Sequence, residues 1–132
     1  MKKLFSIMLI TLAFSAAASA QQVEKLFDKY MEDVRFQYIY DGSDIDKKEG
    51  KWINKGQKML TLSRAETGLV KSFSDEVNAA IKTDGYKQTT FVRNGTNRVS
   101  NYEKETVNKK DELTVIQNNE THIMFIWESY SK

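Results

Sequence analysis

The C-terminal part of the chain, from Tyr86 onward, constrains the fold most, because alternating polar and apolar segments there are separated by tight-turn sequences. YKQTTFVR and RVSNYEKETV flank Asn94-Gly95-Thr96-Asn97, and ELTVIQ and THIMFIWESY flank Asn118-Asn119. Asn-Gly between two such segments is a strong hairpin signature, and the segments are rich in residues that favour strands. The sequence therefore predicts a four-stranded antiparallel meander.

The last of these strands, THIMFIWESY, is apolar on both faces. Alternation places Ile123, Phe125 and Trp127 on one face, and Met124 and Ile126 with His122 on the other. Such a strand is an inner strand covered on both sides, or one whose second face meets a partner. A two-residue turn at Asn118-Asn119 would place Val115 opposite His122 and Leu113 opposite Met124.

Two segments before the meander have helical periodicity. The first is expected over about Gln22 to Asp33, and its apolar face consists of Val23, Leu26, Phe27, Tyr30, Met31 and Val34. The second follows a capping box at Ser63-Arg64-Ala65-Glu66 and should end at Asp84-Gly85. Its apolar positions are Leu69, Val70, Phe73, Val77, Ala80 and Ile81.

Between the helices, VRFQYIY alternates with period two, so a strand over Val34 to Tyr40 is expected. The polar segment DGSDIDKKEGKWINKGQ is expected to form a loop that exposes Trp52, and a short helix or strand around Trp52 and Ile53 is the alternative. KMLTLS is expected to form a short extended segment. Together these elements predict an α+β fold, in which an antiparallel sheet of about four to six strands packs against two amphipathic helices.

The N-terminus has the pattern of a secretory signal peptide. Lys2 and Lys3 precede a short apolar stretch, and Ala18-Ser19-Ala20 is a small-residue cleavage site. The apolar stretch is shorter than the roughly 20 residues of a membrane span. We therefore expect residues 1–20 to be removed and residues 21–132 to form a single domain with no transmembrane span, in the periplasm or on the outer surface of a Gram-negative bacterium.

Charge and cysteine content narrow the function further. The chain has 20 Lys and Arg against 18 Asp and Glu, and removing Lys2 and Lys3 with the leader makes the numbers equal. A neutral surface attracts nucleic acid weakly, so no nucleic-acid partner is expected. The chain has no cysteine, which removes thiol chemistry and disulfides.

The sequence contains no recognisable catalytic or metal-binding motif. His122 is the single histidine, and no H-x-H, H-E-x-x-H, G-x-S-x-G or phosphate-loop pattern is present. A calcium loop starting at Asp44 would have Asp46 at its third position, but Lys48 at the fifth and Glu49 at the sixth. We therefore expect no catalytic residue, no metal and no cofactor. The sequence favours a non-enzymatic function without deciding it.

Aromatic residues are the candidates for ligand binding. Trp52, Tyr38, Tyr40 and Trp127 are predicted to contact a carbohydrate or peptide, because flat rings stack on the apolar faces of such ligands. The alternative is that these rings belong to the core or to ordinary sheet surface, where strands favour aromatics.

The layout resembles a known group of proteins. A leader ending before Gln21, a VEKLFDKY opening helix, a middle helix and the closing hairpin KDELTVIQNNETHIMFIWES are similar to small exported domains of unknown function from gut and oral Bacteroidota. The resemblance implies a periplasmic or surface α+β domain and transfers no functional residue.

Three functions remain open. The first is a non-catalytic exported binding or accessory protein, whose partner could be another envelope protein, a peptide or a carbohydrate. The second is a structural or self-associating envelope module that pairs through the THIMFIWESY strand. The third is a small hydrolase that uses His122 with a serine or a carboxylate.

Overall fold

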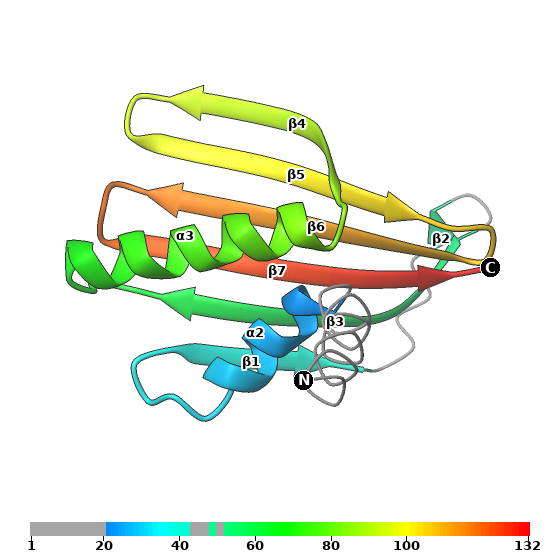
Figure 1. Ribbon diagram of the computed structural model, residues 1–132, viewed down its shortest axis with the longest axis horizontal. Coiled ribbons are helices and arrows are strands. Elements are labelled where there is room, and N and C mark those ends of the chain that lie inside the picture. Colours follow the sequence, from blue (N-terminus) through cyan, green and yellow to red (C-terminus); the bar gives the residue numbers. More distant parts are fainter. Residues whose placement is uncertain (1–20, 43–47, 50–51) are drawn as a thin grey trace, which may run out of the picture.

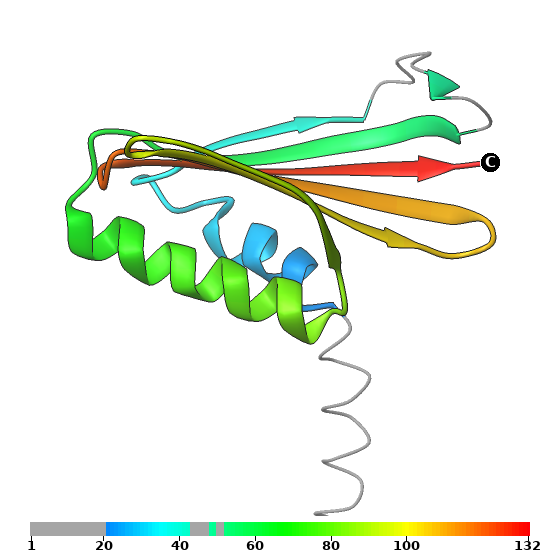
Figure 2. The same cartoon turned by 90° about the horizontal axis from the view of Figure 1, so that it is seen from above.

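The computed structural model describes residues 21–42, 48–49 and 52–132. Two helices lie on one face of an antiparallel sheet, as Figures 1 and 2 show. This arrangement confirms the α+β prediction. The helices are α2 (Gln22–Tyr30) and α3 (Thr67–Thr83), and the strands are β1 (Gln37–Asp41), β2 (Lys48–Glu49), β3 (Trp52–Leu62), β4 (Lys87–Asn94), β5 (Asn97–Glu105), β6 (Lys109–Asn118) and β7 (His122–Ser131).

The strand order is β1-β3-β7-β6-β5-β4, and β2 pairs with the beginning of β3. The predicted meander is therefore confirmed as β4 to β7. β3 is longer than the predicted extended segment KMLTLS, and it includes Trp52 and Ile53, around which a short strand was an alternative to the loop. β3 lies between β1 and β7, and the ladder to β7 keeps it extended from Ile53 to Leu62.

The core lies between β7, β3 and the two helices. Phe125 on β7 is directly opposite Leu60 on β3, and both side chains are fully buried. The Phe27 ring of α2 stacks on Phe125 with 5.1 Å between ring centroids. Phe73 and Val77 of α3 are buried in the same cluster. Ile123, Phe125 and Trp127 thus face the helices, as their alternation predicted.

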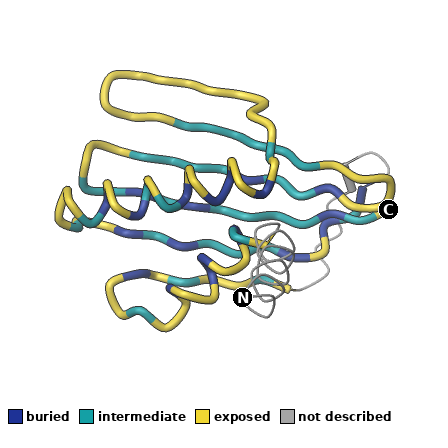
Figure 3. Tube along the Cα trace, in the orientation of Figure 1, coloured by how far each residue is buried: buried dark blue, intermediate teal, exposed yellow. Residues whose placement is uncertain are grey.

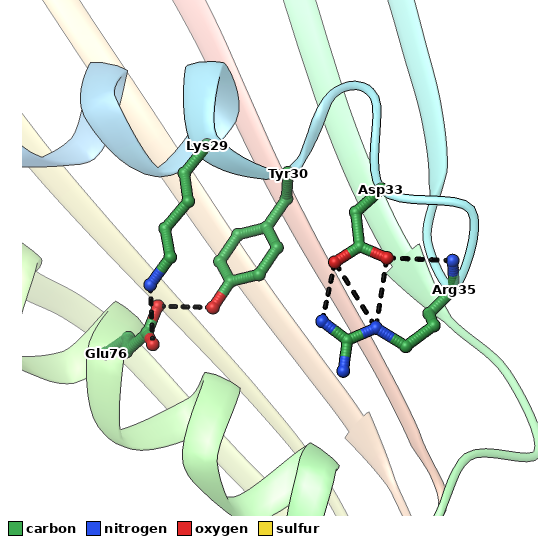
Figure 4. A network of polar contacts seen from close by, with 5 residues as sticks. All are labelled: Lys29, Tyr30, Asp33, Arg35 and Glu76. Carbon is green, nitrogen blue, oxygen red and sulfur yellow. Dashed lines mark hydrogen bonds and ion pairs between the residues drawn. The ribbon is translucent and has the colours of Figure 1, made fainter.

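The first helix is shorter than predicted. α2 ends at Tyr30, and the chain then turns at Asp33, whose carboxylate accepts hydrogen bonds from the backbone N–H and the guanidinium of Arg35 (Figure 4). Val34 is 98% exposed in this turn, so it belongs to neither the helix nor a strand. Phe36 joins the core, and β1 begins at Gln37.

The start of the second helix also differs from the prediction. α3 begins at Thr67, and Glu66 occupies the N-cap position without a side-chain hydrogen bond, so the predicted capping box does not form. Arg64, inside that box, has φ 53°, which is incompatible with a helix at this point. The predicted end is correct, since Gly85 has φ 79° directly after the helix.

Both predicted hairpins form, but the second has a different register. Asn94 pairs with Asn97 as expected for a two-residue turn. At the second turn Asn118 pairs with His122, which leaves a three-residue loop containing Asn119 at φ 55°. As a result Leu113 lies opposite Trp127, not opposite Met124, and it points toward the helices.

We call the sheet surface that faces away from the helices the open face. Both described helices lie on the other side (Figure 2). Met59, Met124, Ile126 and Ile116 are half-buried on the open face, in neighbouring positions of β3, β7 and β6. In the described part of the chain, neither helix has the length and apolar composition needed to cross a membrane.

Candidate functional site

A groove lies between α3 and the neighbouring sheet surface. On that side of the helix lies the β4–β5 hairpin (Figure 1). The groove consists of two hollows of about 200 and 450 Å³, which share Ser74, Asn78, Arg98 and Gln117. We call it the α3 groove. One wall is the outer side of α3, and the other is formed by β4, β5 and β6. Its inner hollow is lined by Ser74, Asn78, Gln88, Phe91, Arg98, Ser100, Tyr102, Val115 and Gln117.

The groove exists because α3 buries only one side of its surface. Val70, Phe73 and Val77 point into the core, while Lys71, Asp75 and Asn78 on the same helix remain exposed. The helix contacts the middle of the sheet, and every residue of β4 stays exposed (Figure 3). The edge of the sheet is therefore left free to form the second wall.

Aromatic side chains occupy the inner hollow. Phe91 on β4 is 53% exposed, and Tyr102 on β5 is half-buried against the core. Phe91 lies opposite Ser100 in the ladder, two positions from Tyr102, so the two rings are diagonal neighbours on one face. Such neighbours are about 7–8 Å apart, which is within reach of one bound ring or chain.

The polar lining consists mainly of uncharged amide and hydroxyl groups. Within residues 52–132, the side chains of Asn78 and Gln88 make no hydrogen bond to another protein group. Gln117 accepts a hydrogen bond of 2.9 Å from the guanidinium of Arg98, through its Oε1 atom. The amide N–H groups of Gln117 therefore remain available as donors to a ligand.

Charge in the groove is nearly balanced. Arg98 is the single charged residue that lines the inner hollow, while Lys71, Asp75 and Glu120 line the outer one. This arrangement favours a polar ligand over one with a high net charge, because neither sign of charge dominates the lining.

The four aromatic residues predicted from the sequence do not form one site. Tyr38 and Tyr40 both lie on β1, where Tyr38 packs against the core and Tyr40 is 61% exposed. Trp127 faces the helices on β7, and its ring centroid is 6.3 Å from that of Phe27. Their role in ligand binding stays a prediction.

The expectation that Trp52 is exposed was wrong. Trp52 begins β3 and is only 7% exposed. Two ammonium groups lie over its ring, with Lys110 Nζ at 5.5 Å and Lys132 Nζ at 5.2 Å from the centroid. The Tyr130 ring, also under Lys110, is buried as well. The polar residues around Trp52 in the sequence gave no indication that its ring is buried in a cluster with Lys110, Tyr130 and Lys132.

Trp127 lines a separate hollow of about 260 Å³ near the start of α2, together with Tyr86, Asp84 and Asp111. Burial raises the pKa of the Tyr86 phenol, and the Asp111 carboxylate adds to the effect. Burial also raises the pKa of Asp111, although Lys109 and a hydrogen bond with Ser129 oppose it. Asp84 in this hollow accepts hydrogen bonds from backbone N–H groups at the start of α2. Its carboxylate therefore has a structural role.

His122 lies at the beginning of β7, beside the β6–β7 turn. Its Nδ1 atom is 2.8 Å from the hydroxyl of Thr121, the residue that precedes it. The segment of Asp44 and Asp46, whose sequence does not fit a calcium loop, lies outside the described residues. Among the residues that are described, no three His, Asp or Glu side chains come close enough to hold a metal ion.

Sequence reasoning missed most of the α3 groove. Tyr102 belonged to the aromatic residues of the predicted strands, but Phe91, Asn78 and Gln117 carried no motif. KQTTFVRN did contain a signal of an exposed strand, because polar residues surround Phe91-Val92 and leave no apolar face to bury in the core.

Comparisons with protein-family models, curated proteins and solved structures found no match for this chain.

Proposed function

We propose that the protein is a non-catalytic binding protein of the bacterial cell envelope and that the α3 groove is its binding site. The main support is that the half-exposed Phe91 ring lies beside the amide groups of Asn78 and Gln88. These amide groups make no hydrogen bond to another described residue. Binding sites combine apolar and aromatic lining with a few polar groups that fix the ligand.

The proposal of export rests on the leader-like residues 1–20 of the sequence. Fractionation of the producing cells tests it. We expect the protein in the periplasmic or surface fraction, and N-terminal sequencing should give Gln21 as the first residue. Recovery of the uncleaved chain from the cytoplasm would contradict export.

NMR titration tests the binding site. The ¹⁵N-labelled protein is titrated with two mixtures, one of oligosaccharides and one of short peptides. We expect at least one mixture to shift the amide resonances of Asn78, Arg98 and Gln117, and Phe91→Ala to need a higher ligand concentration for the same shifts. Shifts confined to other surfaces, or no shifts with either mixture, would refute the groove as the site.

The open face supports a second candidate, self-association of two copies. Ile126 and Met59 are paired across β7 and β3, and Met124 and Ile116 form the next pair across β7 and β6. Two such faces from two copies could pack as a sandwich, about 10 Å apart. Sedimentation equilibrium tests this candidate, which requires a dimer that Ile126→Asp dissociates. A monomer at high concentration excludes it.

The third candidate, a hydrolase that uses His122, has less support. Within the described ranges, the imidazole ring pairs with the adjacent Thr121 hydroxyl, and a triad would also need a group that orients the imidazole. Loss of a measured hydrolytic activity in His122→Ala would be required to revive this candidate.

A further inference from the structure

We infer that the ligand of the α3 groove is an oligosaccharide, an inference that rests on the groove being the binding site. The first reason is the state of the backbone at the groove floor. β5 is paired with β4 along one edge and with β6 along the other over most of its length. Its N–H and C=O groups are used in these ladders, so an extended peptide that lies over β5, and not along the outer edge of β4, would find few main-chain partners.

The second reason is the type of polar group in the lining. The amides of Asn78, Gln88 and Gln117 come from α3, β4 and β6. Asn78 and Gln88 offer both donors and an acceptor, whereas Gln117, whose Oε1 accepts from Arg98, offers mainly its N–H donors. Sugar hydroxyl groups are also donors and acceptors at once, so amides on three sides match them. A peptide presents a fixed alternation of donors and acceptors, which needs an equally regular partner.

The third reason is the position of the rings. Phe91 and Tyr102 are diagonal neighbours on adjacent strands, and Gln88 pairs with Tyr102 directly. A sugar ring has apolar C–H faces that stack on aromatic rings, while its hydroxyl groups point outward to hydrogen-bonding partners. Rings and amides side by side provide both kinds of contact to one sugar unit.

The fourth reason is the extent of the groove. The inner hollow, of about 200 Å³, continues into the outer one, of about 450 Å³. The outer hollow runs along Lys71, Ser74, Asp75 and Asn78 of α3. A site that is elongated in this way suits several linked sugar units.

The test uses the purified protein on a glycan array of polysaccharide fragments, followed by titration calorimetry with the best-binding oligosaccharide. Phe91→Ala should raise its Kd about threefold to tenfold, which is the loss expected for a stacked ring. The matched control is Val92→Ala. Val92 is 54% exposed against 53% for Phe91, but it lies on the opposite face of the same strand. Its replacement should leave the Kd unchanged.

A second pair of variants tests the polar contacts without touching a strand. Asn78→Ala should raise the Kd about threefold, because one hydrogen bond is lost. Ser72→Ala, at an exposed position of the same helix outside the groove, should have no effect. Circular dichroism of all four variants separates loss of binding from loss of folding.

Three results would overturn the inference. If peptides, and no glycan, bind and shift the groove amides, the ligand class is wrong although the proposed function survives. If glycans bind Phe91→Ala and Val92→Ala equally, sugars bind elsewhere. If neither class shifts the groove amides, the proposed function fails together with the inference.

Discussion

At the scale of single residues, Asp84 links two helices that are distant in the sequence. Its carboxylate accepts hydrogen bonds from the backbone N–H groups of Gln22 and Val23, at 2.9 and 2.8 Å. These are N–H groups at the start of α2, which the helix itself cannot satisfy. Gln21, at the N-cap of α2, makes no such side-chain bond. Asp84 therefore caps α2 while it ends α3.

Replacement of Asp84 by alanine should lower the free energy of unfolding by about 1–2 kcal/mol, because one buried and one partly buried N–H group lose their acceptor. Urea denaturation measures the change. Thr83→Ala, at the exposed preceding position, is the control and should change stability little. Equal stability of the Asp84 variant and the control would show that water replaces the cap.

Asp111 is a half-buried carboxylate, and its surroundings are less favourable than those of Asp84. Its Oδ1 atom is buried without a hydrogen-bond partner among the described residues. Burial raises its pKa above the ordinary 3.8, so the folded protein binds this proton more tightly than the unfolded chain. The free energy of unfolding must then fall as the pH rises from about 4 through the raised pKa.

Asp111→Asn should consequently stabilise the protein at pH 7, by about 1 kcal/mol, because the buried charge is removed. The difference should vanish below about pH 4, where Asp111 is protonated in both states. Urea denaturation at several pH values tests this, with the exposed Asp75→Asn of α3 as control. A variant that is less stable at pH 7 would contradict the expected burial penalty.

At the scale of elements, β7 has two different faces. Phe125 is fully buried under α2, whereas Ile126, the next residue, is half-buried on the open face. His122, the one histidine of the chain, lies on the open face together with Ile126. The strand is thus covered by helices on one side, and its second face is the surface that the self-association candidate requires.

The two faces predict different costs of truncation. Phe125→Ala should lower the free energy of unfolding by about 3–5 kcal/mol, because it removes a ring from the closed core. Ile126→Ala should cost about 1 kcal/mol in the monomer, since less apolar surface is buried there. Chemical denaturation at low protein concentration compares them. Equal costs would mean that the open face is covered in solution.

At the scale of the whole molecule, the sheet is covered unevenly. α2 and α3 cover the middle strands of the sheet, and the β4–β5 hairpin lies to one side of them (Figures 1 and 3). This uneven coverage creates the α3 groove. It also leaves β4 as an edge strand with one paired neighbour, while β7 is paired on both sides.

Hydrogen exchange should follow this architecture. The amides of β7 and β3 should exchange slowest and those of β4 fastest, because an exposed edge strand opens without disturbing the core. Exchange measured by NMR on the intact protein tests this order. Protection of β4 equal to that of β7 would indicate that another chain covers the edge.

The sequence by itself determined the local structure. Apolar spacing placed α2 and α3, Asn-Gly placed the β4–β5 turn, and alternation placed Phe125 and Ile126 on opposite faces of β7. These features depend on residues close together in the chain. The capping box at Ser63 failed although it is local, because the Arg64 backbone adopts a left-handed turn between β3 and α3.

Only the tertiary structure decided which strand is central, which aromatic rings are buried and where the groove lies. The length of β3 depends on pairing with β7, and the burial of Trp52 on Lys110 and Lys132. Asp84 reaches residues more than sixty positions away. The groove joins α3, β4, β5 and β6. Such contacts between distant segments have no local pattern, because they form only when the segments pack together.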